Sequence, residues 1–93
     1  MKLSSSRSGD LAEHYAVTLL WDHGYEVYKN SGSTGPVDIV AMKNGEVFFF
    51  DIKSKASNLS WGHTRTKKQK KLGVQILEFN PISRKIRFVE HRE

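Results

Sequence analysis

Asn44 and Gly45 constrain the fold of this chain more than any other feature of its sequence. They separate two apolar runs, VDIVAMK at 37–43 and EVFFFDIKSK at 46–55. An Asn-Gly pair between apolar runs is the strongest short-range signal for a hairpin with a two-residue type I′ turn. If these two residues form the loop, Lys43 faces Glu46 and the pairing of every other residue in the hairpin is fixed.

The remaining patterns predict a single domain over residues 1–93. Apolar residues at helical spacing predict an amphipathic helix over 11–20, capped by Ser8 or Asp10 and ended by Gly24. Strands that are apolar on both faces need cover on both sides, so we expect an α/β fold with a mixed central sheet flanked by helices, in the order α-β-β-β-α-β-β. The other expected elements are strands over 26–30, 74–80 and 84–91 and an irregular loop over 54–63. A short helix is expected within 64–72, capped by Thr64 or Thr66 and ended by Gly73.

The hairpin register places two acids opposite each other. Asp38 faces Asp51, and Lys53 lies on the same face as Asp51, one strand repeat along. Carboxylates in that relation repel each other and call for a counter-charge, which a divalent cation supplies better than one lysine does. The alternative is that both acids sit solvated at strand ends, with Lys53 as an ion-pair partner.

Glu13 is a fourth candidate, at the edge of the apolar stripe of the first helix. A helical wheel lets it lean toward the sheet, whereas His14 points away. The competing interpretation is a capping box, Asp10-x-x-Glu13, in which Glu13 bonds only the first amide of the helix. The residues alone leave both interpretations open.

Composition limits the chemistry and the compartment. The 93 residues include no cysteine, so a metal must be held by oxygen or imidazole ligands. No apolar run is long enough to span a bilayer, and the N-terminus lacks the apolar centre of a signal peptide. We therefore expect no membrane association and an intracellular protein, cytoplasmic, nucleoid-associated or in the cytoplasm of a phage-infected host.

The positive charge points to nucleic acid as a partner. The formal net charge is +5, and five cations fall within residues 65–71, where an ordinary solvated helix would include acids. These cations are therefore predicted to contact phosphates. Arg7, in a serine-rich segment, is a further candidate for such a contact, the alternative being that the N-terminus is frayed. Trp61 and His63 stand in the expected loop, where an aromatic ring stacks on a base or anchors the loop. The predicted phosphate-binding residues are Arg7, Arg65, Lys67, Lys68, Lys70 and Lys71.

Taken together, these residues resemble the PD-(D/E)XK nuclease superfamily. Its pattern, an acid on one strand and D/E-x-K on the next, matches Asp38 in GPVDIVA and Asp51-Ile52-Lys53 in FFFDIKSK. The stretch GDLAEHYAVTLLWDHGYEVYKN also resembles the first helix and strand of archaeal-type Holliday junction resolvases, in which a helix glutamate matching Glu13 joins the site. The resemblance implies a restriction-endonuclease-like fold.

The same resemblance implies a Mg²⁺-dependent endonuclease, with Mn²⁺ as a substitute, acting on branched DNA as a homodimer. Glu13, Asp38 and Asp51 would bind the metal and Lys53 would assist the attacking water, while Gln69 is the candidate for a glutamine near the site. The alternatives are a restriction, homing or repair nuclease of the same superfamily, a non-catalytic DNA-binding module on this fold, and a structural accessory subunit.

Overall fold

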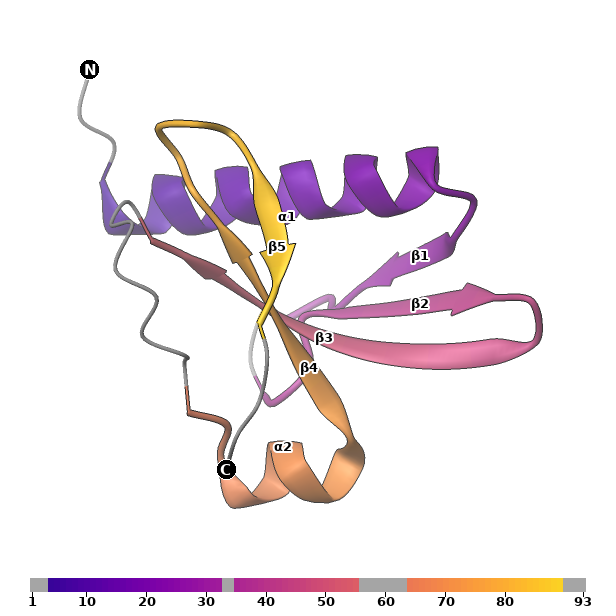
Figure 1. Cartoon of the computed structure of the whole chain (residues 1–93). Helices are drawn as coiled ribbons and strands as arrows, with labels where there is room; N and C mark the ends of the chain where they lie inside the picture. Colours follow the sequence, from indigo (N-terminus) through magenta and orange to yellow (C-terminus); the bar gives the residue numbers. More distant parts are fainter. Residues whose placement is uncertain (1–3, 33–34, 56–63, 90–93) are drawn as a thin grey trace.

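The computed structural model of the chain describes residues 4–32, 35–55 and 64–89, which form a five-stranded mixed sheet and two helices in the predicted order (Figure 1). The sheet order follows the chain, with β3 and β4 parallel and the other neighbouring strands antiparallel. Trp61 and His63 lie outside the described residues, as does most of the expected 54–63 loop. The elements are α1 (Ser5–Asp22), β1 (Glu26–Lys29), β2 (Ile39–Lys43), β3 (Glu46–Ser54), α2 (Lys67–Leu72), β4 (Val74–Phe79) and β5 (Ile86–Phe88).

The hairpin between β2 and β3 has the predicted register. Lys43 pairs with Glu46, and the turn residues Asn44 and Gly45 have φ of 54° and 80°, the left-handed values that a type I′ turn requires. Regular pairing stops at Ile39, so β2 is shorter than the expected 37–43 strand and Asp38 lies just before it. β3 continues past that point to Ser54, where it pairs with β4 but no longer with β2.

Helix α1 begins earlier than the apolar stripe predicts. Ser4 is its N-cap and accepts a hydrogen bond from the amide of Arg7 at 3.3 Å, so neither Ser8 nor Asp10 is the cap. Ser8 has another role, because its hydroxyl lies 2.9 Å from the hydroxyl of Ser54 at the end of β3. The serine-rich segment is therefore the first turn of the helix.

Helix α1 covers one face of the sheet (Figure 1). Ala16 and Leu20 of α1 pack with Ile39, Ala41, Phe50 and Leu77 in a fully buried cluster. The small Ala16 side chain permits a close approach of helix and sheet, and burial of the larger side chains stabilises the fold by about 1.5–3 kcal/mol each. In the part of the chain that the structure describes, no helix is long and apolar enough to cross a membrane.

The second half of the fold follows from the parallel pairing of β3 with β4, which requires a crossover connection. This connection contains α2, which begins at Lys67 after the N-cap Thr66 and ends at Gly73, whose φ is 73°. Thr66 is one of the two predicted caps, and the predicted end at Gly73 is confirmed. The last strand begins two residues later than the predicted 84–91, because a turn closed by the Asn80 amide and the Lys85 carbonyl at 2.9 Å takes up its first two residues. Residues 90 and 91 of that prediction lie outside the described residues.

Candidate active site

Asp38 occupies the point where β2 separates from β3. Its amide donates to the carbonyl oxygen of Phe50 at 2.8 Å, and its Oδ2 accepts a hydrogen bond from the amide of Ile52 at 2.7 Å. The backbone pairing of β2 with β3 stops at Ile39, so the predicted pair between Asp38 and Asp51 is not formed. The amide of Ile52 bonds to the side chain of Asp38 and not to a backbone carbonyl of β2. This contact holds the carboxylate against the part of β3 that has no β2 partner, which we call the open edge of β3.

Asp38 and Asp51 form a hydrogen-bonded acid pair. Asp51 is buried, with 7% of its surface exposed, and Asp38 is half-buried. The pKa of Asp38 is raised from 3.8 to about 6, first by burial, then by its hydrogen bond to Asp51 and by the charges of Asp51 and Glu13, against a lowering by the Ile52 amide. Burial and the neighbouring negative charges both disfavour the ionised form of Asp38, so a positive charge beside the acid pair would be stabilising.

Lys53 supplies part of that positive charge. Its Nζ lies 3.4 Å from Oδ2 of Asp51, and 47% of its side chain is exposed. The two residues share one face of β3, as the strand period requires. The lysine therefore has one side toward the buried acid and the other toward solvent, where a substrate can reach it.

Gln69 connects α2 to the acid pair. Its Nε2 donates to Oδ2 of Asp51 at 2.9 Å and to the carbonyl oxygen of Pro36 at 3.0 Å. Its Oε1 accepts a hydrogen bond from the amide of Thr66 at 3.0 Å, which completes a capping box. Only 6% of Gln69 is exposed, so this side chain is a buried link and not a solvated residue on a basic helix.

Glu13 lies in the middle of α1, and because the helix begins at Ser5 the capping-box interpretation is wrong. Its Oε1 is 3.6 Å from Nζ of Lys29 at the end of β1, and its charge contributes to the raised pKa of Asp38. Lys29 was not among the predicted residues. Lys29 pairs with Ile39 beside Asp38, but the hairpin register does not extend across the loop between β1 and β2, so no local pattern indicated it.

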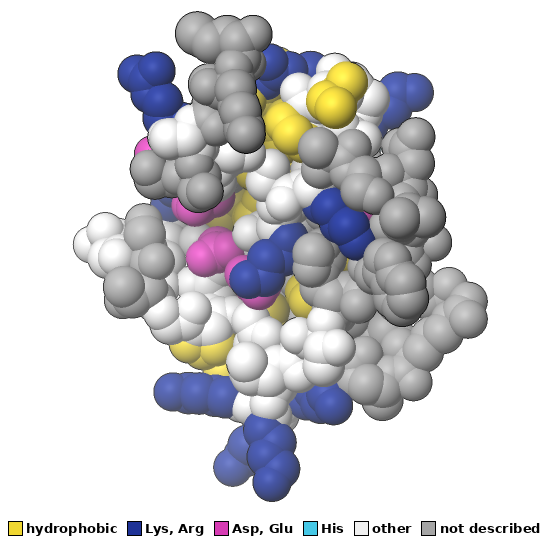
Figure 2. Space-filling view, turned by 90° about the vertical axis from the view of Figure 1, so that its left-hand side faces the viewer, with side chains coloured by type: hydrophobic (Ala, Val, Ile, Leu, Met, Phe, Trp, Pro, Cys, Tyr) yellow, Lys and Arg dark blue, Asp and Glu magenta, His cyan; other side chains and the backbone are white. Residues whose placement is uncertain are grey.

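The predicted phosphate-binding residues divide into three groups. Four lysines are exposed on α2, whereas the Arg65 guanidinium donates to the carbonyl oxygen of Val74 at 3.2 Å and is half-buried. Arg7 is exposed on the first turns of α1. Figure 2 shows acidic side chains gathered in the middle of one face, with Lys and Arg side chains beside, above and below them. The four lysines are Lys67, Lys68, Lys70 and Lys71.

Comparisons with known proteins identify the family and the fold of this chain. The sequence matches the family described as archaeal Holliday junction resolvase (Hjc) over residues 4–84. Among solved structures, a bacterial homing endonuclease, I-Ssp6803I, matches with a TM-score of 0.72 and 18% identity over 94% of this chain, which spans 65% of the length of that protein. A search of the curated proteins found no match.

The structural match confirms the restriction-endonuclease-like α/β fold, with its mixed sheet and flanking helices. The family match covers all the described elements except β5, including the acids, the lysine and Gln69. The chain therefore belongs to the archaeal Holliday junction resolvase family and, with it, to the PD-(D/E)XK nucleases.

Proposed function

We propose that this protein is a divalent-cation-dependent endonuclease that hydrolyses phosphodiesters in branched DNA. The observation that carries the proposal is the acid pair beside Lys53, at the open edge of β3, in a chain of this nuclease family. A half-buried carboxyl group with a pKa of about 6 is costly for folding, and such groups cluster at functional sites.

The residues present fit a hard divalent cation. Mg²⁺ is commonly held by one or two carboxylates together with water and a substrate phosphate, and Asp38 and Asp51 would hold it here, with Glu13 as the third acid of the site. Among the described residues, no three His, Asp or Glu side chains are placed to hold a metal ion without rearrangement, and Glu13 is paired with Lys29. When bound, Mg²⁺ or Mn²⁺ supplies an acidic bound water and neutralises charge that develops on the phosphate.

The side chains of the site have separate tasks in this proposal. Lys53, beside Asp51 and open to solvent, orients the attacking water and faces the negative charge of the phosphate. Asp51 is held by Gln69, and Asp38 is held by the amide of Ile52. The two carboxylates are thus fixed by neighbours before any substrate binds, which lowers the cost of reaching the reactive geometry.

The lysines of α2, together with Arg7 and Arg65, are proposed to contact DNA phosphates. Such contacts give affinity and orientation but carry little sequence information, which suits an enzyme that recognises the shape of a branched substrate. A homing-type nuclease that cuts linear DNA is the second candidate, because the fold of I-Ssp6803I is so similar.

A panel of substrates separates these candidates. Four-way, flapped and linear duplexes of equal length are incubated with the protein and Mg²⁺, Mn²⁺ or EDTA. We expect cutting of the four-way junction with either metal and none with EDTA. Cutting of linear duplexes at one sequence would favour the homing candidate, and binding to DNA without cutting of any substrate would favour a non-catalytic module.

Lys53→Ala is expected to lower the cleavage rate by about a hundredfold or more, because a positioned proton-transfer or charge-stabilising group contributes at least that much. The matched control is Lys55→Ala, which removes the same charge two residues later. Rates at saturating DNA are compared by gel under single-turnover conditions. Equal rates for the two variants would exclude a catalytic role for Lys53.

We also propose that the protein acts as a homodimer, since a four-way junction offers two symmetry-related cutting sites. Ile82 on the β4–β5 turn and Phe88 on the edge strand β5 are exposed apolar side chains that an interface between two copies would cover. Light scattering is expected to give twice the chain mass at micromolar concentrations. A monomer mass at every concentration up to those used for cleavage would remove this proposal.

A further inference from the structure

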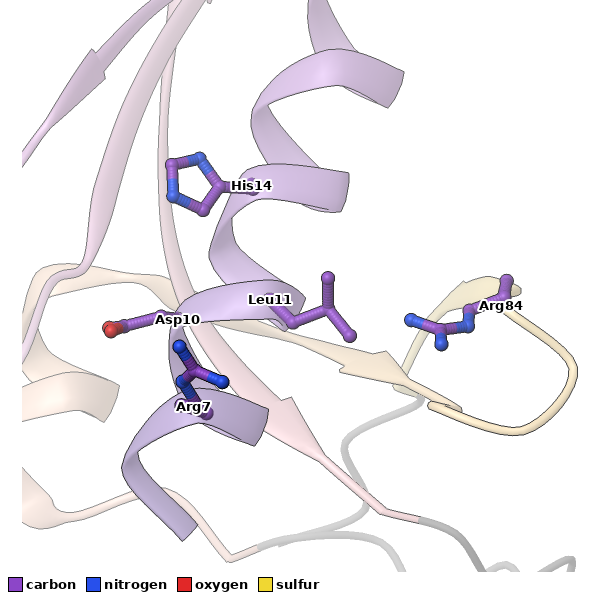
Figure 3. A pocket seen from close by; sticks show the side chains of 5 residues that line it. All are labelled: Arg7, Asp10, Leu11, His14 and Arg84. Carbon is purple, nitrogen blue, oxygen red and sulfur yellow. The ribbon is translucent and has the colours of Figure 1, made fainter. Parts of the chain in front are cut away.

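A second positively charged region lies on the outward side of α1, apart from the acid pair. It is a groove of about 390 Å³ between the first turns of α1 and the β4–β5 turn (Figure 3). We call it the α1 groove. Residues from both ends of the chain line it, namely Arg7, Asp10, Leu11, His14 and Arg84.

Arg84 is held in place by an ordered turn. Its amide donates to the carbonyl oxygen of Asn80 at 2.8 Å, and Oδ1 of Asn80 accepts bonds from the amides of Ile82 at 2.9 Å and Ser83 at 3.2 Å. The backbone of Arg84 has φ of 64°, a left-handed conformation that is costly for a residue other than Gly, Asn or Asp. Its guanidinium lies 5.7 Å from the centre of the Tyr15 ring.

The α1 groove has an excess of positive charge. It contains two guanidinium groups but a single carboxylate, that of Asp10. Within the described residues, neither Arg7 nor Arg84 forms an ion pair with an acid. Two arginines that line one groove, neither of them paired with an acid among the described residues, supply guanidinium donors for a phosphate group.

The position of the groove relates it to the acid pair. On α1, residues 7, 11 and 14 follow the spacing of one helix face, whereas Glu13 points to Lys29 on β1. Figure 1 places the N-terminal turns of α1 and the β4–β5 turn on one side of the molecule and α2 at its opposite end. In Figure 2, Lys and Arg side chains lie at both of these ends, and the acids lie between them.

We propose that the α1 groove binds a backbone phosphodiester of DNA on the side of the acid pair opposite to α2, with Arg84 as its principal contact. The substrate then spans the acid pair, with one contact region at each end. Asp10 repels the backbone and confines the phosphate to the part of the groove near Arg84. This inference rests on the proposed function, because it assigns a second contact region to the same DNA substrate.

Arg84→Asn tests the inference, since Asn tolerates the left-handed backbone and removes the guanidinium. Binding to a four-way junction is measured by fluorescence anisotropy in EDTA at several salt concentrations. We expect an affinity about threefold to tenfold lower and a salt slope smaller by about 1, the change for one lost phosphate contact. Lys85→Asn, which removes a neighbouring exposed charge outside the groove, is expected to leave both values nearly unchanged.

Asp10→Asn supplies a test of opposite sign. We expect it to tighten DNA binding about threefold, whereas Asp22→Asn, at the far end of α1, has little effect. Equal affinities for Arg84→Asn and Lys85→Asn would overturn the inference, as would equal affinities for the two acid variants. If the wild-type protein binds no DNA, the proposed function fails. If it binds DNA and the groove variants bind with the same affinity as the wild type, only the inference fails.

Discussion

Asp51→Asn is expected to abolish cleavage of branched DNA, with a rate at least about a thousandfold below that of the wild type, because it removes a charged metal ligand. Asn keeps the shape of the side chain, and its Oδ1 can still accept the hydrogen bond from Gln69 that Asp51 accepts at 2.9 Å. The fold should therefore persist while the charge that faces Lys53 is lost. Single-turnover cleavage with Mg²⁺ gives the rate, and circular dichroism checks the fold.

The matched control for this loss is Glu46→Gln, at the exposed hairpin end of the same strand. This variant loses the same charge but should cut at the wild-type rate. Normal cleavage by Asp51→Asn would rule out a catalytic role for the acid pair, and the protein would then be a DNA-binding module on a nuclease fold.

Asp38→Asn is expected to stop cleavage. At neutral pH it should also raise the free energy of unfolding by about 1 to 2 kcal/mol, a value that allows for solvent screening of a half-exposed group. The folded protein raises the pKa of Asp38 from 3.8 to about 6. Above pH 3.8 the unfolded chain releases this proton more readily, so stability falls as the pH rises toward and through 6. The variant lacks this loss, since Asn has no proton to release.

Urea unfolding at pH 4, 5, 6 and 7 without metal measures the effect. The difference between Asp38→Asn and the wild type should be small at pH 4 and grow to its full size above pH 6. Mg²⁺ should raise the melting temperature of the wild type but not that of the variant, because binding to the folded state alone stabilises it. A difference that is constant across this pH range would contradict the assigned pKa.

The sequence predicted the order of the elements and the meeting of the two acids because local rules govern both. A two-residue turn at Asn44 and Gly45 fixes the partner of every residue in the hairpin, and the register is confirmed as far as Ile39. The departure comes one residue later, where Asp38 leaves the ladder and its side chain accepts the Ile52 amide. Periodicity indicates which face a residue occupies, but it does not indicate where a strand exchanges a backbone partner for a side chain.

Contacts between distant segments were harder to predict. The pair of Glu13 with Lys29 depends on how α1 lies over β1, and the place of Arg84 depends on a turn that takes up the first two residues of a predicted strand. The true start of α1 at Ser5 was missed because residues 5–8 are polar and carry no apolar stripe. Each of these features is set by packing between elements, which no short stretch of sequence encodes by itself.

The hydrogen bonds of Gln69 have a consequence for how the enzyme assembles. Because its oxygen closes the start of α2 while its nitrogen holds Asp51, the amide has one productive orientation, and reversing it would break contacts at both ends. A six-residue helix is too short to be stable in isolation, so α2 and the geometry of Asp51 must form together. The Gln69 amide thus links the helix that carries four exposed lysines to the buried carboxylate of Asp51.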